Sequence, residues 1–350
     1  MKIFLAGDWR AKLELRLRQL AESQSTASIF VPLRNLAWAA AKVRNFLNPH
    51  KPYRAPIPVI SVGNITVGGT GKTPFVKWLV RRLVETGCRP AILTPLGESD
   101  DEVKEHAHED PSRSEFSRVF PGRDRVANVK RAIEWGATVV VLDDGFQFRS
   151  LHRDVDIVLW DATSPLFAGN PFLREPLTGL WRATCVVMSK ADALSDKERE
   201  SLRQELEKWA GQGKVVAAFG YEPVGVKLIS GDNLLDGKDF RASRFLLLAG
   251  VANPRYFFLT ARQAGFNAVA MVCFPDHHRY RPSDARLIAE LAETENADAI
   301  LTTRKDAVKL RGLWRGEIPL LILEVKLRWL WGEEKLWETV ERVLSCKAHN

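Results

Sequence analysis

Short apolar runs alternate along the chain with longer stretches in which apolar residues recur every three or four positions. The short runs have the length of strands, and the longer stretches, such as residues 126–135 and 195–209, have helical spacing. This alternation is typical of a parallel sheet covered by helices, because each parallel strand needs a crossover back to the same edge. The predicted strands of this first series are residues 58–62, 90–94, 138–142, 155–160 and 185–188.

A second series with the same rhythm begins after residues 211–238, where the pattern loosens into short runs and glycine turns. It contains predicted strands at 245–248, 268–274, 299–302 and 319–323 and helices at 254–265 and 283–294. A last helix is predicted at 334–344, and its pattern fits a cover for either domain. We therefore expect an α/β chain with two domains. The expected divisions are a polar N-terminal segment (residues 1–29), an amphipathic helix (30–50), a larger domain (51–220), a linker (221–243) and a smaller domain (244–350).

The N-terminal region contains two different patterns. Residues 1–26 are polar and charged, which predicts a frayed helix, whereas residues 30–47 combine an apolar helical face with Trp38 and flanking basic residues. Such a face is typical of a helix that lies in an anionic membrane surface. A core helix packed on its own domain has a similar pattern, and both interpretations stay open. No apolar run in the sequence is long enough to cross a bilayer.

A glycine-rich segment connects the first predicted strand to an amphipathic helix. It consists of Thr66, Val67, Gly68, Gly69, Thr70, Gly71, Lys72 and Thr73. Glycines let successive backbone N–H groups point into one concavity, which suits a phosphate group. Lys72 would reach the β- and γ-phosphates, and the Thr73 hydroxyl would bind Mg²⁺. The common pattern has glycine at the position of Thr66, but the doubled-glycine form is a variant of the same loop. This segment predicts a nucleoside-triphosphate site.

Two other strand ends carry side chains suited to chemistry. Asp143 and Asp144 follow an apolar run, at the sheet edge where we expect the glycine-rich segment, and carboxylates there suit Mg²⁺. Asp276, His277 and His278 follow a strand of the second series, where a histidine can orient or deprotonate a hydroxyl. A zinc site is the other interpretation of these histidines, since His106 and His108 also lie close together.

Lys190 and Asp192 resemble the K-x-D element with which GTPases recognise guanine. This short match supports a rival interpretation, in which the chain is a P-loop GTPase or ATPase that acts as a metallochaperone or a switch. A protein of this kind would bind GTP without needing an acceptor substrate.

The charge balance favours an anionic partner. The 51 Lys and Arg residues exceed the 43 Asp and Glu residues, for a formal net charge of +8. Nucleic acid, a phosphorylated substrate and an acidic membrane surface all suit such an excess. The four cysteines are scattered singly, which is typical of reduced thiols in a cytosolic protein, and the N-terminus has no credible signal peptide.

Laid end to end, several segments resemble the tetraacyldisaccharide 4′-kinase family of Gram-negative bacteria. They include GNITVGGTGKTP (residues 63–74), DDGFQFRSLHRDVDIVLWD (143–161), NPFLREP (170–176), AGVANPRYFF (249–258), FPDHHRY (274–280) and TTRKDAVKL (302–310). The resemblance implies a P-loop NTPase-type parallel sheet domain joined across a cleft to a smaller α/β domain. It implies ATP- and Mg²⁺-dependent phosphorylation of the 4′-hydroxyl of a tetraacyldisaccharide 1-phosphate, forming lipid IVA in lipid A biosynthesis.

The same resemblance implies peripheral attachment to the cytoplasmic face of the inner membrane. The expected partners are therefore the acylated disaccharide 1-phosphate and an anionic membrane surface, with no role for nucleic acid. The resemblance leaves the acyl-chain specificity and the oligomeric state open.

The resemblance also implies roles for individual residues. Residues 66–73 match the ATP loop, Asp143 and Asp144 match the acids near Mg²⁺, and Arg174 and Glu175 match an Arg–Glu pair at the phosphate and metal site. His277 matches a histidine that partners a catalytic aspartate, for which Asp101 is the best match. A sugar hydroxyl is a poor nucleophile, so a positioned carboxylate is needed to accept its proton.

Three positions depart from the family pattern. The chain has TPLG at residues 94–97 where the family carries SRGYG, Phe148 in place of a histidine, and Arg304 in place of a glutamate. The abbreviated segment leaves the choice between Asp100 and Asp101 as the base open. A catalytically inactive nucleotide sensor is a third interpretation of these changes.

Overall fold

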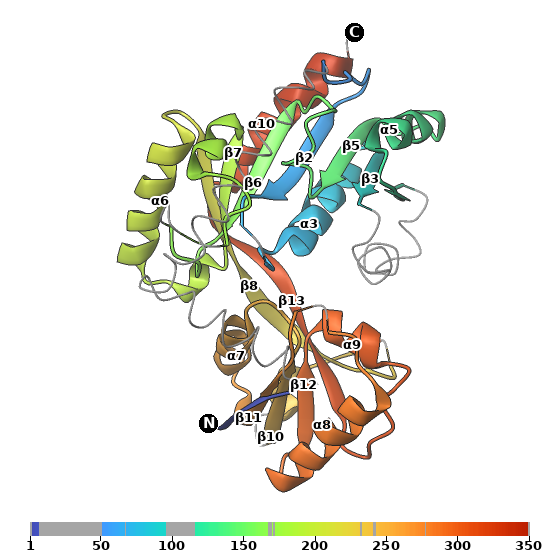
Figure 1. Cartoon of the computed structure of the whole chain (residues 1–350), viewed down its shortest axis with the longest axis vertical. Coiled ribbons are helices and arrows are strands. Elements are labelled where there is room, and N and C mark those ends of the chain that lie inside the picture. Colours follow the sequence, from blue (N-terminus) through green and yellow to red (C-terminus); the bar gives the residue numbers. More distant parts are fainter. Residues whose placement is uncertain are drawn as a thin grey trace. The chain divides into compact units, whose positions relative to one another are not determined.

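The computed structural model describes residues 2–6, 51–66, 68–95, 116–166, 170, 172–231, 233–240, 243–276 and 278–348. By its internal contacts the chain forms two compact units (Figure 1). The P-loop unit comprises residues 21–220 and 329–350, and the smaller unit comprises residues 1–20 and 221–328. The helices of the described residues include none that is both long enough and apolar enough to span a membrane.

The P-loop unit is built on parallel strands in the order β8-β7-β6-β2-β5-β3-β4. β2 lies between β6 and β5, so the loop that follows it leaves the middle of the sheet (Figure 1). Five strands are buried along their whole length, which explains their continuous apolar sequences. The strands are β2 (Val59–Asn64), β3 (Pro90–Thr94), β4 (Arg118–Pro121), β5 (Val139–Asp143), β6 (Val155–Asp161), β7 (Cys185–Ser189) and β8 (Val215–Leu228), whose last part belongs to the smaller unit.

The helices of this unit follow from local sequence. α3 buries the apolar positions that the helical spacing predicts, and α5 and α6 begin at the side-chain caps Asp124 and Ser195. Ser195 and Glu198 form a full capping box at the start of α6. The helices are α3 (Lys72–Glu85), α5 (Arg125–Glu134), α6 (Asp196–Ala210) and α10 (Glu333–Ala348), with the short 3₁₀ turns η2 (Leu177–Arg182) and η3 (Ala191–Ala193).

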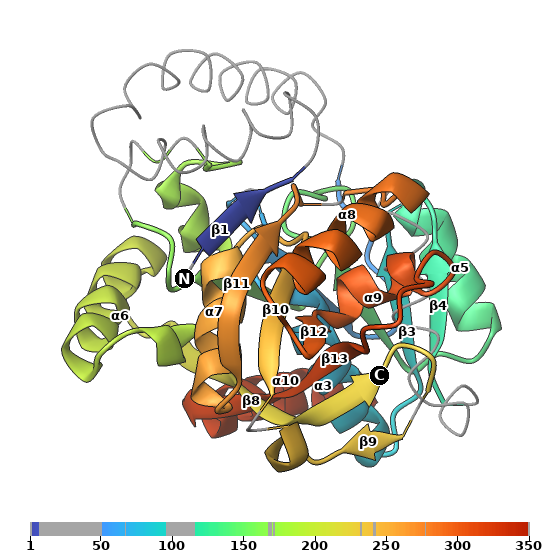
Figure 2. The same ribbon diagram turned by 90° about the horizontal axis from the view of Figure 1, so that it is seen from below.

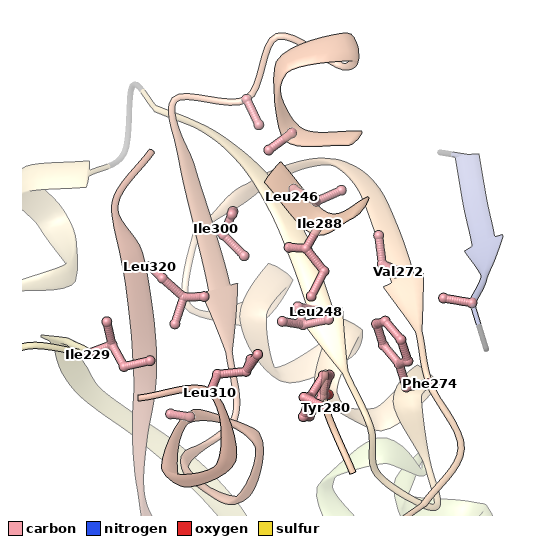
Figure 3. Close-up of a cluster of buried hydrophobic side chains, with 14 of the residues drawn as sticks. Ile229, Leu246, Leu248, Val272, Phe274, Tyr280, Ile288, Ile300, Leu310 and Leu320 are labelled. Atoms are coloured by element: carbon pink, nitrogen blue, oxygen red, sulfur yellow. The ribbon is translucent and has the colours of Figure 1, made fainter. Parts of the chain in front are cut away.

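The smaller unit has parallel strands in the order β1-β11-β10-β12-β13. Leu248 and Ile300 of the sheet pack with Ile288 and Leu310 of the covering helices in one of its cores (Figure 3). The elements are β1 (Lys2–Leu5), β9 (Leu234–Leu235), η4 (Gly237–Phe240), β10 (Arg244–Ala249), α7 (Pro254–Gln263), β11 (Asn267–Cys273), α8 (Pro282–Thr294), β12 (Ala299–Thr302), α9 (Arg304–Leu310) and β13 (Leu320–Trp331), whose last residues belong to the P-loop unit. The fold is therefore α/β, with a P-loop NTPase-type parallel sheet and a second, smaller α/β unit.

The described part of the N-terminus differs from the predicted frayed helix. Lys2–Leu5 forms β1, which pairs in parallel with β11 and lies beside it in Figure 2. Phe4 and Leu5 pack against the two cores of the smaller unit, so burial of these apolar residues favours the strand. The predicted amphipathic helix over residues 30–50 lies outside the described residues.

Two expected domain limits also differ from the structure. Residues 221–243 are not a plain linker, because they contain the end of β8, which pairs with β9, and Val226 is buried in a core. Residues 329–350 belong to the P-loop unit and not to the smaller one. α10 buries Leu336, Trp337 and Val340. Burial of this apolar stripe stabilises the position of the C-terminal helix in the P-loop unit.

Candidate active site

The glycine-rich loop between β2 and α3 has a backbone that only glycine adopts readily. Gly68 has a φ of 116° and Gly71 a φ of 80°, both in the left-handed region. Gly71 is the N-cap of α3 and has no side chain to occupy the first turn of the helix. A helix N-terminus in this state presents backbone N–H groups and a positive dipole to an anion. The loop therefore fits a phosphate group.

The base of this loop is held by later parts of the chain. Asn64 at the end of β2 donates from Nδ2 to Thr70 Oγ1 over 3.0 Å, and this bond is buried. The Gln147 side chain donates to the Asn64 carbonyl over 2.8 Å, and the Arg174 backbone N–H donates to the Ile65 carbonyl over 2.7 Å. Sequence reasoning missed Asn64 and Gln147, although both lie in the family-like segments around the glycines and the paired acids.

Lys72, Asp144 and Arg174 meet beside the loop. Lys72 Nζ lies 3.3 Å from Asp144 Oδ1, and Arg174 NH1 lies 2.9 Å from Asp144 Oδ2. Burial by itself raises the pKa of Asp144, but the charges of Lys72 and Arg174 outweigh it and hold that pKa below its usual range. The carboxylate is therefore ionised at neutral pH and forms ion pairs with both a lysine and an arginine.

The two acids after the apolar run lie at the carboxyl end of β5. Asp143 is buried and in register with Val62 of the neighbouring strand β2, and Asp144 follows in the left-handed region with a φ of 51°. Thr73 lies in the first turn of α3. Two carboxylates, one hydroxyl and the phosphates themselves are a donor set that suits Mg²⁺, which usually takes one or two carboxylates plus phosphate oxygens. These residues therefore fit a nucleotide-bound Mg²⁺.

Glu175 occupies a different position from its neighbour Arg174. Its carboxylate accepts two hydrogen bonds from Arg182, over 2.8 and 3.2 Å, and Arg149 NH2 lies 3.5 Å from it. The structure thus pairs Glu175 with two arginines, and its role at the metal stays a prediction. Thr66 is buried and forms a β-bridge with Leu173. Val67, Asp101 and His277 lie outside the described residues, as do Asp100, His106 and His108.

Arg125 is a further cation at this site that sequence reasoning missed. It is the first residue of α5 and is 5% exposed, and its NH1 donates to the Asp144 carbonyl over 3.3 Å. Its guanidinium lies 5.4 Å from the centre of the Phe148 ring. Phe148, one of the departures from the family pattern, therefore supports an arginine by a cation–π contact. The feature of the sequence that could have indicated Arg125 was its position directly after Asp124, a residue type that often caps the start of a helix.

The strand ends of the smaller unit carry their own polar cluster. The buried Asp306 accepts hydrogen bonds from the Gly250 N–H (2.9 Å), the Thr303 hydroxyl (2.8 Å) and the Tyr280 hydroxyl (3.0 Å). Burial raises the pKa of Asp306 despite these bonds. His278 Nε2 lies 3.0 Å from Asp284 Oδ2, and Lys305 pairs with Asp276 over 2.9 Å. These contacts order the segments on either side of position 277. Arg304, another departure from the family pattern, pairs with Glu324 over 2.5 Å.

Comparison with known proteins identifies the family. A family model described as tetraacyldisaccharide-1-P 4′-kinase (LpxK) matches residues 26–95 and 112–345. The tetraacyldisaccharide 4′-kinase of Halothermothrix orenii is 31% identical, covering 87% of this chain and 90% of that protein. That of Syntrophus aciditrophicus is 33% identical, covering 79% of this chain and 81% of that protein.

A solved structure agrees with these sequence matches. The crystal structure of LpxK from Aquifex aeolicus in complex with ATP superposes with a TM-score of 0.62 and 25% identity, covering 91% of this chain and 99% of that one. The rival interpretation of a metallochaperone or switch is not favoured by these matches. The phosphate loop, the acids after β5 and the two-unit α/β fold lead to the same assignment: the chain belongs to the tetraacyldisaccharide-1-P 4′-kinase family.

Proposed function

We propose that this chain transfers the γ-phosphoryl group of ATP to the 4′-hydroxyl of a tetraacyldisaccharide 1-phosphate, forming lipid IVA. Membership of the family makes the chain a kinase that uses ATP. One observation supports the site within it: Lys72, Asp144 and Arg174 form a charged group directly beside the loop that precedes α3.

Each residue of this group has a distinct role in the proposal. Lys72 and Arg174 contact the phosphates and offset the charge that spreads over the transferring oxygens. Thr73, Asp143 and Asp144 would hold Mg²⁺, which supplies further positive charge at the β- and γ-phosphates when bound. Because its pKa is held low, Asp144 is ready as an anionic ligand at neutral pH. Glu175 is the remaining candidate for the metal.

Asp101 and His277 complete the proposal on sequence grounds. Asp101 accepts the proton of the 4′-hydroxyl, and His277 orients or tunes that carboxylate. Their assignment rests on the family-like acidic cluster at residues 99–102 and on the DHH segment at residues 276–278.

The place of action is the cytoplasmic face of the inner membrane, with the chain attached peripherally. The proposal rests on the acylated substrate, on the net charge of +8 and on the apolar and basic pattern of residues 30–47. Such a segment would bring the site to the surface in which the acyl chains are anchored.

Transfer of labelled γ-phosphate from ATP to a purified tetraacyldisaccharide 1-phosphate tests the function directly. Lys72→Ala is expected to lower kcat by about a thousandfold, because one preorganised charge at the transferring group contributes several kcal/mol. Arg81→Ala is the control, since Arg81 pairs with Glu85 along the exposed surface of the same helix. Near wild-type transfer by Lys72→Ala would contradict the assignment of the loop.

A further inference from the structure

The lysine of the K-x-D element has no place in the proposed function, yet its position in the fold is unusual. Lys190 directly follows β7, has a φ of 56° in the left-handed region and is only 6% exposed. Burying an ammonium group costs free energy unless the group is paired with an opposite charge and hydrogen-bonded. A lysine in this position therefore needs such partners.

The Lys190 ammonium is held from two sides. Its Nζ donates to the Gly69 carbonyl of the glycine-rich loop over 2.7 Å, and it forms an ion pair with Asp161 at the end of β6. Asp161 is itself fixed, because its other carboxylate oxygen accepts from the Thr163 N–H over 3.0 Å and the Thr163 hydroxyl over 2.5 Å. The ends of two neighbouring strands thus hold the ammonium against the loop.

The peptide group between Gly69 and Thr70 is consequently held at both of its polar atoms. Its carbonyl accepts from Lys190, and its N–H donates to the Gly68 carbonyl over 3.0 Å. Gly69 is otherwise exposed, and Gly68 and Gly71 have glycine-type backbones, so the loop has many conformations to lose. A phosphate-binding loop works best when its N–H groups are oriented before the anion arrives.

We propose that Lys190 is a positioning residue, which holds the glycine-rich loop in its phosphate-binding conformation by fixing the Gly69–Thr70 peptide. The K-x-D element is associated with recognition of the nucleotide base. In this proposal its lysine, Lys190, acts instead at the phosphate end of the nucleotide. The inference rests on the proposed function, because it takes the loop to be the ATP site.

The test needs a variant that removes the contact without leaving a buried charge. Lys190→Met alone strands the Asp161 carboxylate, which is strongly destabilising. The double variant Lys190→Met/Asp161→Asn removes both charges and keeps an amide oxygen at position 161 that can accept from Thr163 in the same geometry. Asp161→Asn alone keeps the bond from Lys190 to the Gly69 carbonyl but removes the opposite charge that anchors the buried ammonium, so it is compared only where its melting temperature shows that it is folded.

The chain offers a matched control at the opposite end of β2. Lys347 Nζ donates to the Ala55 and Ile57 carbonyls, each over 3.2 Å, and pairs with Asp154 over 2.8 Å. Lys347→Met/Asp154→Asn therefore removes another lysine–carboxylate pair with carbonyl contacts from the same unit, away from the loop, and keeps an amide oxygen at position 154 that can accept from the Val59 N–H.

We expect the Lys190→Met/Asp161→Asn variant to raise KM for ATP by at least about tenfold, since a hydrogen bond to a charged group is worth that much. The KM for the lipid acceptor and the inhibition constant of AMP, which has no β-phosphate, stay unchanged. Asp161→Asn alone raises KM for ATP a few-fold, and the Lys347 double variant leaves it unchanged. Circular dichroism and the melting temperature establish that each variant is folded.

Several results would overturn the inference. An unchanged KM for ATP in either Lys190 or Asp161 variant removes the positioning role, as does a rise that the Lys347 control shares. Equal weakening of ATP and AMP, or an altered preference between ATP and GTP, assigns Lys190 to the base instead. If Lys72→Ala is inactive while the Lys190 double variant is normal, only this inference fails. If Lys72→Ala retains transfer, the proposed function fails.

Discussion

Asp144 combines a left-handed backbone with a carboxylate shared by two cations. Aspartate and asparagine adopt this backbone more readily than other residues with side chains, so the position after β5 restricts the residue type before any chemistry is considered. The partners Lys72 and Arg174 come from α3 and from the segment before η2. The residue therefore ties three parts of the P-loop unit together.

Replacing Asp144 tests both its charge and its pKa. Asp144→Asn keeps the backbone preference but leaves Lys72 and Arg174 without their anion, so the free energy of unfolding at pH 7 should fall by about 2 kcal/mol. Because the pKa of Asp144 is lowered on folding, its contribution is present above the ordinary value of 3.8 and is lost as the pH falls through the lowered value. The difference between wild type and variant should therefore shrink below about pH 4.

Urea titrations from pH 3 to pH 7 measure this difference. Glu338→Gln, which neutralises an exposed carboxylate of the same unit, is the control. A difference between wild type and Asp144→Asn that is independent of pH would contradict the lowered pKa.

The proposed base and its partner are also tested at the scale of single residues. Asp101→Ala and His277→Ala should each lower kcat strongly, and the double variant should lose much less than the sum of the two, as residues that act as a unit do. The measurement is steady-state transfer with both substrates saturating. Additive losses argue against the pairing, and an inactive Asp100→Ala beside an active Asp101→Ala would transfer the role to Asp100.

At the scale of elements, the turn after β5 packs directly on β2. A Cβ atom at Gly63 would lie 2.6 Å from Phe146 Cβ and 2.8 Å from the Phe146 backbone nitrogen. The turn that follows Asp143 and begins with Asp144 can approach the strand that leads into the glycine-rich loop only because residue 63 is glycine. Close backbone packing thus brings the acids to the phosphate loop.

Gly63→Ala should separate these two elements. We expect a loss of about 2 kcal/mol in the free energy of unfolding from overpacking, together with weaker ATP binding as the acids are displaced. Gly231→Ala is the control, because a Cβ there meets no atom within 4 Å, and reduced chain entropy should leave it neutral or slightly stabilised. Chemical denaturation and nucleotide titration of both variants check the comparison. Unchanged stability of Gly63→Ala would mean that the turn is not packed as described.

At the scale of the whole molecule, a net charge of +8 must act together with an apolar contact if the chain is to meet a membrane. Residues 30–47 supply that contact in our proposal, and each basic residue near an anionic surface adds about 1 kcal/mol. Leu33→Glu/Trp38→Glu should release the protein from anionic vesicles and leave nucleotide binding intact. Added salt should weaken the wild-type association, since the electrostatic part is screened.

Vesicle sedimentation beside a nucleotide titration decides between the two interpretations of this segment. A core helix predicts the opposite result, in which the double variant misfolds and loses nucleotide binding while the wild type stays in the supernatant. Neutral vesicles of the same acyl composition are the control for charge.

Local patterns in the sequence determined the parts of this protein that depend on neighbouring residues. The buried strands β2 and β5, the glycine-rich loop and α3 were all predicted because burial of a parallel strand and helical spacing leave their mark within a few residues. The placing of Asp143 and Asp144 near the loop followed from one rule, that parallel strands end at a common edge. Family motifs then identified the chemistry.

Contacts between distant residues were decided by the tertiary structure alone. Lys190 lies 121 residues from Gly69, and Lys347 lies 193 residues from Asp154. Neither pairing produces a periodic pattern in the sequence. The residue is a lysine in both cases, whether its ammonium group is solvated or buried against a carbonyl. For the same reason the sequence left open which domain α10 covers, although the expected division put it in the smaller one, and it missed the pairing of β1 with β11. Amphipathic patterns show that a face is buried, but only the folded chain selects what covers it.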